Sequence, residues 1–285
     1  MRCFHLFHGR WTRLSVLSVA AGALAAMASM AAPSFAGTVT FGAGANQFSM
    51  EFVTIGNPGN AADTTGIPNP AGSVGRIYDI GKFEVSRDMI NKYNATSGTV
   101  KISLYDLSSG FAAGANGPNR PATGISWNEA ARFVNWLNTS TWNQAAYKFT
   151  TGGYNDNIAL WTSGEAGYDL NNKYRNSLAK YFLPSADEWY KAAYYNPANN
   201  TYYDYTNGSN TIPIASAGGT TTGTAVYGNA YSDGPVDVNQ AGGLSPYGVM
   251  GLGGNVFELV LKQAIACLSE SDFRSAAATE PAGLV

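Results

Sequence analysis

Histidine and cysteine are scarce in this 285-residue sequence, which has two of each. The histidines are His5 and His8, and the cysteines are Cys3 and Cys267. After removal of residues 1–36, which the N-terminal pattern predicts, one cysteine and no histidine remain. This excludes Ser-His-Asp and Cys-His nucleophile systems, histidine-ligated zinc or iron and an intramolecular disulfide. Any metal site must therefore use oxygen ligands.

Charge is also scarce, because only 13% of residues are Asp, Glu, Lys or Arg. The formal net charge is −2, and removal of the N-terminal arginines makes the remaining chain more acidic. Such a chain has no basic surface for nucleic acid or for an anionic membrane. The composition therefore excludes both as partners.

The N-terminus has the pattern of an export signal. Three arginines precede an uncharged run over residues 14–32, and the small residues Ser34 and Ala36 suit cleavage before Gly37. We therefore expect residues 1–36 to be a signal peptide and the protein to be exported to the periplasm, the cell surface or the medium. The alternative is an uncleaved anchor, which would be the protein's sole contact with a membrane.

A glycine-rich run over residues 247–258 is the most informative stretch of the chain. It contains four glycines in eight positions, and it ends in Asn255 and Glu258. A phosphate-binding loop needs a Lys-Ser/Thr pair after its last glycine, and a dinucleotide site needs a third glycine that Val256 replaces. Two interpretations remain: a structural turn, or a cation site made of backbone carbonyls and the Glu258 carboxylate.

Two segments begin with strong helix signals. Ser126 with Glu129, and Ser185 with Glu188, have the spacing of capping boxes, and an apolar face follows each at helical period. The two glutamates could also be read as a catalytic acid pair, but capping accounts for each of them locally.

The other predicted elements are short. Strands are expected over 38–41, 51–55 and 77–85, and Ser86 is expected to cap a short helix. Glu84 is expected to be an exposed strand residue, with a buried acid as the alternative. Residues 139–180 and 199–229 are read as loops; the Asp and Asn residues at 152–157 lack the Gly and Glu of a calcium loop. The pattern predicts an irregular α+β domain.

In their order along the chain, six segments resemble the formylglycine-generating enzyme, or sulfatase-modifying factor, family over residues 39–258. They are Glu51-Phe52-Val53-Thr54-Ile55, Lys82-Phe83-Glu84-Val85-Ser86, the run from Arg120 to Ala130, the run from Phe182 to Ala193, Pro235-Val236-Asp237, and the run from Gly248 to Glu258. The resemblance implies one domain over residues 37–258 with a C-type-lectin-like fold and little regular secondary structure. Family enzymes oxidise a sulfatase cysteine to formylglycine, using oxygen and copper held by two C-terminal cysteines.

The resemblance also implies a structural calcium site. Its ligands would be the Glu258 carboxylate, the backbone carbonyls of Gly254 and Val256, and a side-chain oxygen at the position of Gly251. Because glycine has no side chain, calcium is expected to bind weakly here or to be replaced by water.

Residues 259–285 depart from the family pattern. They lack an Arg-Gly-Gly-Ser segment, the cysteine pair and a Gly-Phe-Arg close, and Cys267 alone cannot form a two-thiolate copper site. We therefore expect an atypical tail, out of frame or truncated, no copper, no catalytic residues and no oxidase activity as the chain is written. One alternative is a lectin-like module that binds a glycan or a protein. The other is an active oxidase whose correct downstream frame restores the cysteines.

Overall fold

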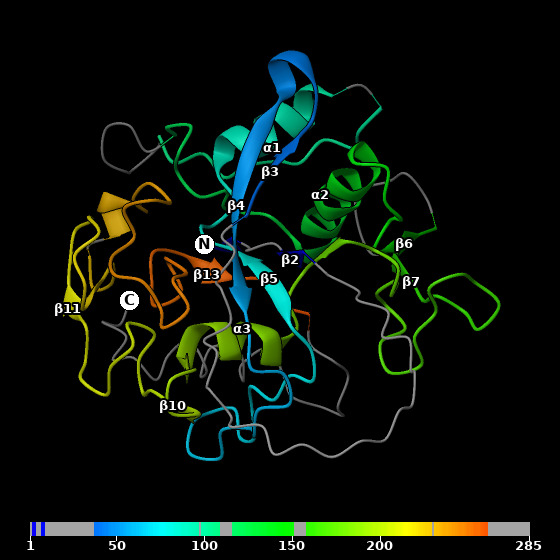
Figure 1. Cartoon of the computed structure of the whole chain (residues 1–285). Coiled ribbons are helices and arrows are strands. Elements are labelled where there is room, and N and C mark those ends of the chain that lie inside the picture. Colours follow the sequence, from blue (N-terminus) through cyan, green and yellow to red (C-terminus); the bar gives the residue numbers. More distant parts are fainter. Residues whose placement is uncertain are drawn as a thin grey trace, which may run out of the picture.

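A five-stranded antiparallel sheet forms the centre of the protein (Figure 1). The computed structural model describes residues 2–3, 7–8, 37–96, 98–108, 116–150, 158–229 and 231–261. The strands lie in the order β3 (Gly37–Phe41), β4 (Phe48–Ile55), β5 (Tyr78–Gly81), β2 (Phe7–His8) and β8 (Tyr181–Phe182). Each strand is antiparallel to its neighbours.

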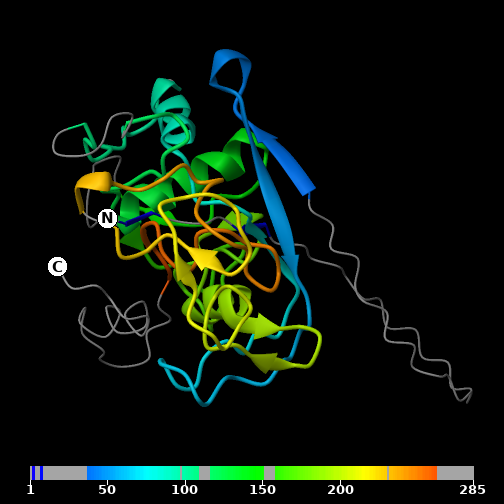
Figure 2. The same cartoon turned by 90° about the vertical axis from the view of Figure 1, so that its left-hand side faces the viewer.

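The β3–β4 hairpin confirms the two strands predicted at the start of the domain and extends along one side of the molecule (Figure 2). Buried and exposed residues alternate over the first half of β4, as expected for a strand with one face on the core. A short 3-10 helix, η1 (Gly44–Asn46), closes the hairpin. Gly42 has φ +74, and a Cβ there would lie 2.3 Å from the Asn46 carbonyl oxygen, so the turn requires glycine.

The next strand is shorter than its sequence pattern suggested. A strand was expected over 77–85, whereas β5 ends at Gly81 and an irregular segment continues to Ser86. The Ser86 side chain then caps α1 (Arg87–Ala95) by accepting a hydrogen bond from the Met89 amide at 3.4 Å, which confirms the predicted cap. Ile90 and Tyr93 face the core from this helix.

Both predicted capping boxes are present. Ser126 and Glu129 begin α2 (Trp127–Ser140), and Ser185 and Glu188 begin α3 (Ala186–Tyr194). In each box the serine hydroxyl accepts a hydrogen bond from the glutamate amide, while the glutamate carboxylate accepts one from the serine amide. Both glutamates therefore serve as capping residues, and they stand at the starts of separate helices (Figure 1).

The core lies between the sheet and the helices and is rich in aromatic rings. Phe41 of β3 meets Tyr181 of β8 edge to face, with ring centroids 5.0 Å apart. Phe48 of β4 stacks on Phe133 and Trp136 of α2, with centroids 6.2 and 5.9 Å away. These contacts join the two end strands of the sheet, β3 and β8, to each other and join β4 to α2, so that the sheet and this helix share one hydrophobic core.

The remaining strands are two residues long and form small separate ladders. They are β1 (Arg2–Cys3) with β13 (Phe257–Glu258), β6 (Lys148–Phe149) with β7 (Ile158–Ala159), β9 (Tyr195–Asn196) with β10 (Thr201–Tyr202), and β11 (Ile214–Ala215) with β12 (Thr224–Ala225). One further 3-10 helix is η2 (Tyr231–Asp233). Most of the described chain is loop, as the expected α+β fold of low regularity requires.

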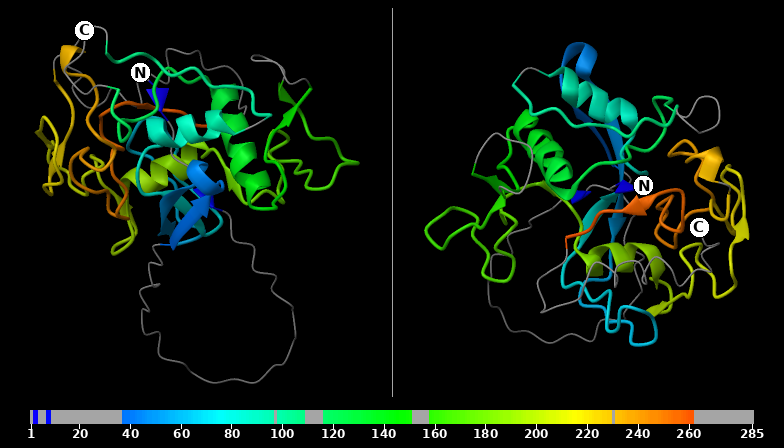
Figure 3. Two further views of the ribbon diagram at one scale, coloured as in Figure 1. Left: turned by 90° about the horizontal axis from the view of Figure 1, so that it is seen from above. Right: turned by 180° about the vertical axis from the view of Figure 1, so that it is seen from behind.

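The two long loop regions lie on opposite sides of the molecule (Figures 1 and 3). The segment after β7, coloured green, projects on the side of α2, whereas the yellow segment around β11 projects on the opposite side. The described loop residues 158–178 and 199–229 therefore present two separate surfaces rather than one.

Several sequence predictions fall outside the described residues. They concern the calcium-like stretch at 152–157, the tail beyond residue 261 with Cys267, and the expected signal peptide apart from β1 and β2. Within the described parts of the chain, no helix combines the length and apolar character needed to cross a membrane.

Candidate functional site

The glycine-rich run forms a tight turn that docks on the sheet. The backbone has positive φ at Gly248 (+94), Gly251 (+84) and Asn255 (+64). The Met250 amide donates to the Lys82 carbonyl at 2.9 Å, which ties the turn to the segment after β5. A Cβ on Gly254 would lie 2.1 Å from the Val226 carbonyl oxygen, so backbone packs directly on backbone there. We call residues 248–258 the glycine turn.

Asn255 holds the glycine turn to three other segments. Its backbone amide donates to the Val226 carbonyl at 2.8 Å, and its side-chain oxygen accepts from the backbone amide of Val236 at 2.8 Å. Its side-chain nitrogen donates to Glu84 Oε2 at 2.7 Å. Asparagine tolerates the left-handed backbone that this position adopts, which explains why a residue with a side chain can stand here.

Glu84 is fully buried, so the expectation of an exposed strand residue was wrong. The strand ends three residues earlier, and the irregular backbone turns the carboxyl group inward towards the glycine turn. Its Oε1 has no hydrogen-bond partner among the described residues. Burial raises the pKa of Glu84 well above its usual range, and the charge of Glu258 raises it further.

The three residues predicted to bind calcium lie at the end of the same turn. Glu258 is in β13, and both of its carboxylate oxygens are buried. The Gly254 carbonyl accepts a hydrogen bond from the Val256 amide at 2.8 Å, and a carbonyl oxygen has a second lone pair. No group of three or more His, Cys, Asp or Glu side chains within the described ranges is arranged to hold a metal ion. A cation here would therefore need backbone carbonyls as well as carboxylates.

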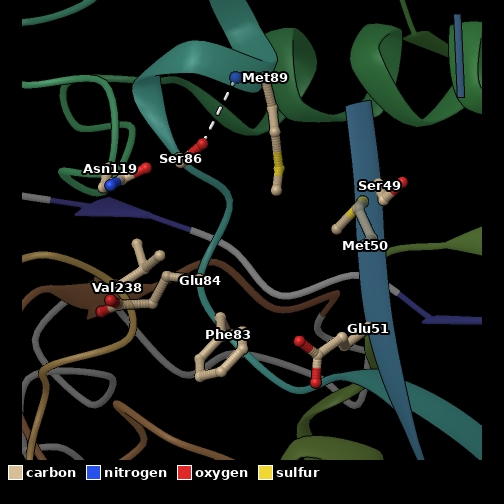
Figure 4. A pocket seen from close by; sticks show the side chains of 9 residues that line it. All are labelled: Ser49, Met50, Glu51, Phe83, Glu84, Ser86, Met89, Asn119 and Val238. Carbon is tan, nitrogen blue, oxygen red and sulfur yellow. Dashed lines mark hydrogen bonds between the residues drawn. The ribbon is translucent and has the colours of Figure 1, made fainter. Parts of the chain in front are cut away.

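A cavity of about 120 Å³ lies against Glu84. In Figure 4 the Glu84 carboxyl group extends towards Val238, while Glu51 of β4 stands across the cavity. The nine lining residues combine polar and apolar side chains: Ser49, Met50, Glu51, Phe83, Glu84, Ser86, Met89, Asn119 and Val238. The volume is large enough for several water molecules beside the buried carboxyl group.

A lysine on α3 is buried, which its sequence pattern did not predict. Lys191 is completely inaccessible to solvent, its Nζ donates to the Asn57 carbonyl at 2.8 Å, and it lies 5.6 Å from the centroid of the Tyr195 ring. Burial lowers the pKa of Lys191 to about 8. In the sequence, Lys191 stands between Trp189 and Ala192, two residues of the predicted apolar face of α3. This position was the signal that could have indicated its burial.

Comparison with known proteins identifies a family for this chain. Residues 26–265 match the family described as the sulfatase-modifying factor enzyme 1-like domain. No curated protein matches the chain. Among solved structures, the chain is similar to Treponema denticola variable protein 1, with 19% sequence identity and a TM-score of 0.43 over 76% of this chain and 74% of that chain. The assignment rests on the family match, which covers well over half of the sequence.

Proposed function

The chain belongs to the sulfatase-modifying factor enzyme 1-like family, and from this premise we propose that it is an exported member without cysteine oxidase activity. The family match confirms the resemblance found in the sequence and, with it, the irregular α+β, C-type-lectin-like fold. Export is proposed from the N-terminal pattern alone, in which three arginines precede an uncharged run and small residues. Cleavage before Gly37 would remove β1 and β2, and with β2 the strand that pairs with both β5 and β8.

The proposed lack of activity rests on the number of cysteines in the chain. A copper site of two thiolates needs two cysteines close together. Cys3 belongs to the segment expected to be removed on export, and Cys267 is the sole cysteine beyond it. The 285-residue chain processed in this way cannot form the family's copper site.

We expect no formylglycine when the purified protein is incubated with copper, oxygen and a peptide carrying a sulfatase-type cysteine. The measurement is mass spectrometry of the peptide, with a two-cysteine family enzyme as the positive control. A parallel Cu(I) titration against a competing chelator should show no tight binding by the protein. Formylglycine in the test reaction would overturn the proposal and favour the active-oxidase alternative.

We further propose that the glycine turn binds calcium in a structural role. Its ligands would be the Glu258 carboxylate and the backbone carbonyls of Gly254 and Val256, as the family resemblance implies. Support comes from the buried, unpaired Oε1 of Glu84, which adjoins the same turn and fits a site for a hard cation. The ion would neutralise buried carboxylates and fix the turn against the sheet.

A second candidate is a lectin-like module that binds a protein or a glycan. The observation in its favour is the loop surface around residues 158–178, where large apolar side chains are exposed. Leu170 and Leu178 are 70% and 55% exposed, and Leu160 and Tyr174 of the same segment are 44% and 38% exposed. Single exposed apolar side chains are common on protein surfaces, whereas several in one segment are typical of interaction surfaces.

If this candidate is right, a glycan array or a pull-down with surface proteins should retain the wild-type chain through that loop surface. The variant Leu170→Ser should reduce retention several-fold, because it removes an exposed apolar contact. Ile214→Ser is the matched control, since Ile214 is 71% exposed on the opposite loop surface. Equal retention of both variants and the wild type would argue against the surface, and no retained ligand would argue against the module.

A further inference from the structure

The two outer strands of the five-stranded sheet differ in how their free edges are protected. The strand order ends in β3 on one side and in β8 on the other. A strand at the end of a sheet has backbone N–H and C=O groups that point away from its neighbour and can pair with another chain. Proteins limit such pairing with very short strands, charged side chains, proline or a covering segment. Some of these devices protect β8, whereas β3 has none of them.

β8 is short, and its backbone is already bonded to α2. The strand consists of Tyr181 and Phe182, which are both buried. The Asn138 side chain of α2 accepts a hydrogen bond from the Tyr181 amide at 3.0 Å and donates one to the Tyr181 carbonyl at 2.8 Å. This end of the sheet therefore offers no free row of backbone groups to another chain.

β3 (Gly37–Phe41) is longer and has an unoccupied edge. Its five residues, Gly-Thr-Val-Thr-Phe, include no charged residue and no proline. β4 pairs with it along its whole length on one side. On the other side, the backbone of β3 forms no hydrogen bond with any other described part of the chain. Figure 2 shows β3 at the outer margin of the sheet. The edge is thus free to accept another strand.

The sequence of β3 is suited to pairing with itself. Thr38 and Thr40 are exposed on one face, whereas Val39 is half-buried and Phe41 fully buried on the core face. The order Thr-Val-Thr is the same in both directions. If two copies pair antiparallel about Val39, each Thr38 stands opposite Thr40 of the second copy, and the two valines stand opposite each other. The outer and core faces of the two sheets then coincide, as a sheet requires.

No repulsion opposes this pairing. Threonine and valine favour strands, and cross-strand threonine pairs stabilise them. Glu51 is the one charged residue of β4, and it lies opposite Thr38 within the chain. Its carboxylate pairs with the Lys82 amine at 2.9 Å, which compensates its charge. Two copies can therefore approach through β3 without placing like charges directly opposite each other.

We propose that β3 is a dimerisation edge, at which the β3 strands of two copies pair antiparallel about Val39 and join the two sheets into one. The two copies would be related by a two-fold axis, the commonest symmetry of homodimers. A pair of five-residue strands is small compared with the about 1,200–2,000 Å² interfaces of stable complexes, so we expect a dimer that dissociates on dilution. This assembly goes beyond the proposed function and requires neither its calcium site nor its lack of oxidase activity.

Sedimentation velocity of the purified chain, from micromolar to near-millimolar concentration, tests this proposal. The wild type is compared with Thr38→Lys/Thr40→Lys and Thr38→Lys/Thr40→Glu. We expect the first variant to dimerise at least about tenfold more weakly, because it places lysines directly opposite each other in both symmetric pairs. The second variant places each lysine opposite a glutamate of the second copy and should dimerise at least as well as wild type, more strongly at low salt than at high salt. Ser49→Lys is the control on the same exposed face of β4, away from the edge, and should dimerise as wild type does.

Hydrogen exchange provides a second measurement. Amides of β3 that point away from β4 should exchange quickly in dilute wild-type protein and become protected as the concentration rises. A wild type that stays monomeric at every concentration would refute the proposal. A dimer that Thr38→Lys/Thr40→Lys leaves intact would place the interface elsewhere. If both double variants are equally monomeric, the register about Val39 is wrong. Circular dichroism establishes that each variant is folded.

Each sample is measured in a chelator and in millimolar calcium. Dimerisation should be the same in both, because β3 contributes no ligand to the calcium site proposed above. Thermal unfolding of the same samples separates the two proposals, since a ligand that binds the native state raises Tm. An unchanged Tm would argue against the calcium site and leave the pairing of β3 unaffected.

Discussion

Replacement of Glu188 by alanine should destabilise the protein by about 3–5 kcal/mol, the range for breaking a buried ion pair. Glu188 is 2% exposed and lies between two arginines, Arg76 and Arg175. The Arg175 guanidinium is 3.3 Å from one carboxylate oxygen and packs 4.1 Å from the centroid of the Phe182 ring. Without the carboxylate, this buried guanidinium would lose its charged partner.

Arg175 is the reason why Glu188→Ala should lose so much stability. Burial, followed by the neighbouring charge of Arg76, lowers the pKa of Arg175 to about 10. Arg175 is still charged at neutral pH, but its charge is less favourable in the native protein than in water. Glu188→Ala would remove the compensating negative charge and one half of the α3 capping box in a single step. Glu188→Gln keeps a capping side chain without the charge and should cost less than the alanine variant.

Glu129→Ala is the matched control for Glu188→Ala. Glu129 occupies the same capping position in α2, is also buried, and forms no ion pair within the described residues. Its loss should cost about 1 kcal/mol, the usual contribution of a helix cap. The measurement is urea unfolding followed by tryptophan fluorescence and circular dichroism. Equal losses in the two variants would show that the arginines contribute nothing beyond the cap.

Features encoded by neighbouring residues could be predicted from the sequence. Each capping box depends on two residues three positions apart, so Ser126 with Glu129 and Ser185 with Glu188 identify helix starts without any knowledge of the fold. The β3–β4 hairpin is similarly local, since its turn and alternation lie within twenty residues. The family match then supplied the fold, because these local signals occur in a characteristic order.

The candidate site could be predicted only in part, because it depends on distant contacts. Glu84 sits in an alternating pattern that favours a strand with one exposed face, and its burial follows from a hydrogen bond to Asn255, 171 residues later. The glycine turn was evident from its composition, but composition does not reveal which segment faces it. A pattern of neighbours cannot show that Gly251 makes room for Glu84; that relation appears when the two segments are placed in space.

The contact between α2 and β8 is likewise not predictable from neighbouring residues, and its loss should have the second large effect on stability. Asn138 is polar and yet completely buried in α2. Its side-chain oxygen accepts hydrogen bonds from the Lys180 and Tyr181 amides, each at 3.0 Å. Its side-chain nitrogen donates to the Tyr181 carbonyl at 2.8 Å and to the Val134 carbonyl at 3.1 Å. One side chain therefore bonds both backbone groups of Tyr181, the first residue of β8, and the amide of the residue before it.

Asn138→Ala should destabilise the protein by about 3–5 kcal/mol, because it leaves several backbone groups buried without partners and creates a cavity. Asn135→Ala on the same helix is the matched control. Asn135 makes the same kind of bonds, donating to the Tyr147 carbonyl at 2.7 Å and accepting from its amide at 2.9 Å, but it is only half-buried. Its loss should cost about 1–2 kcal/mol, since water can replace part of the bonding.

Hydrogen exchange separates a local role of Asn138 from general destabilisation. In Asn138→Ala, the Lys180 and Tyr181 amides should lose protection more than amides of the β3–β4 hairpin, because their acceptor is removed directly. Equilibrium unfolding in urea gives the accompanying loss of stability. If Asn138→Ala and Asn135→Ala cost the same and protection falls evenly over the protein, Asn138 does not hold β8 to α2. A selective loss at β8 would instead establish that one buried amide positions the strand whose Tyr181 ring packs against Phe41.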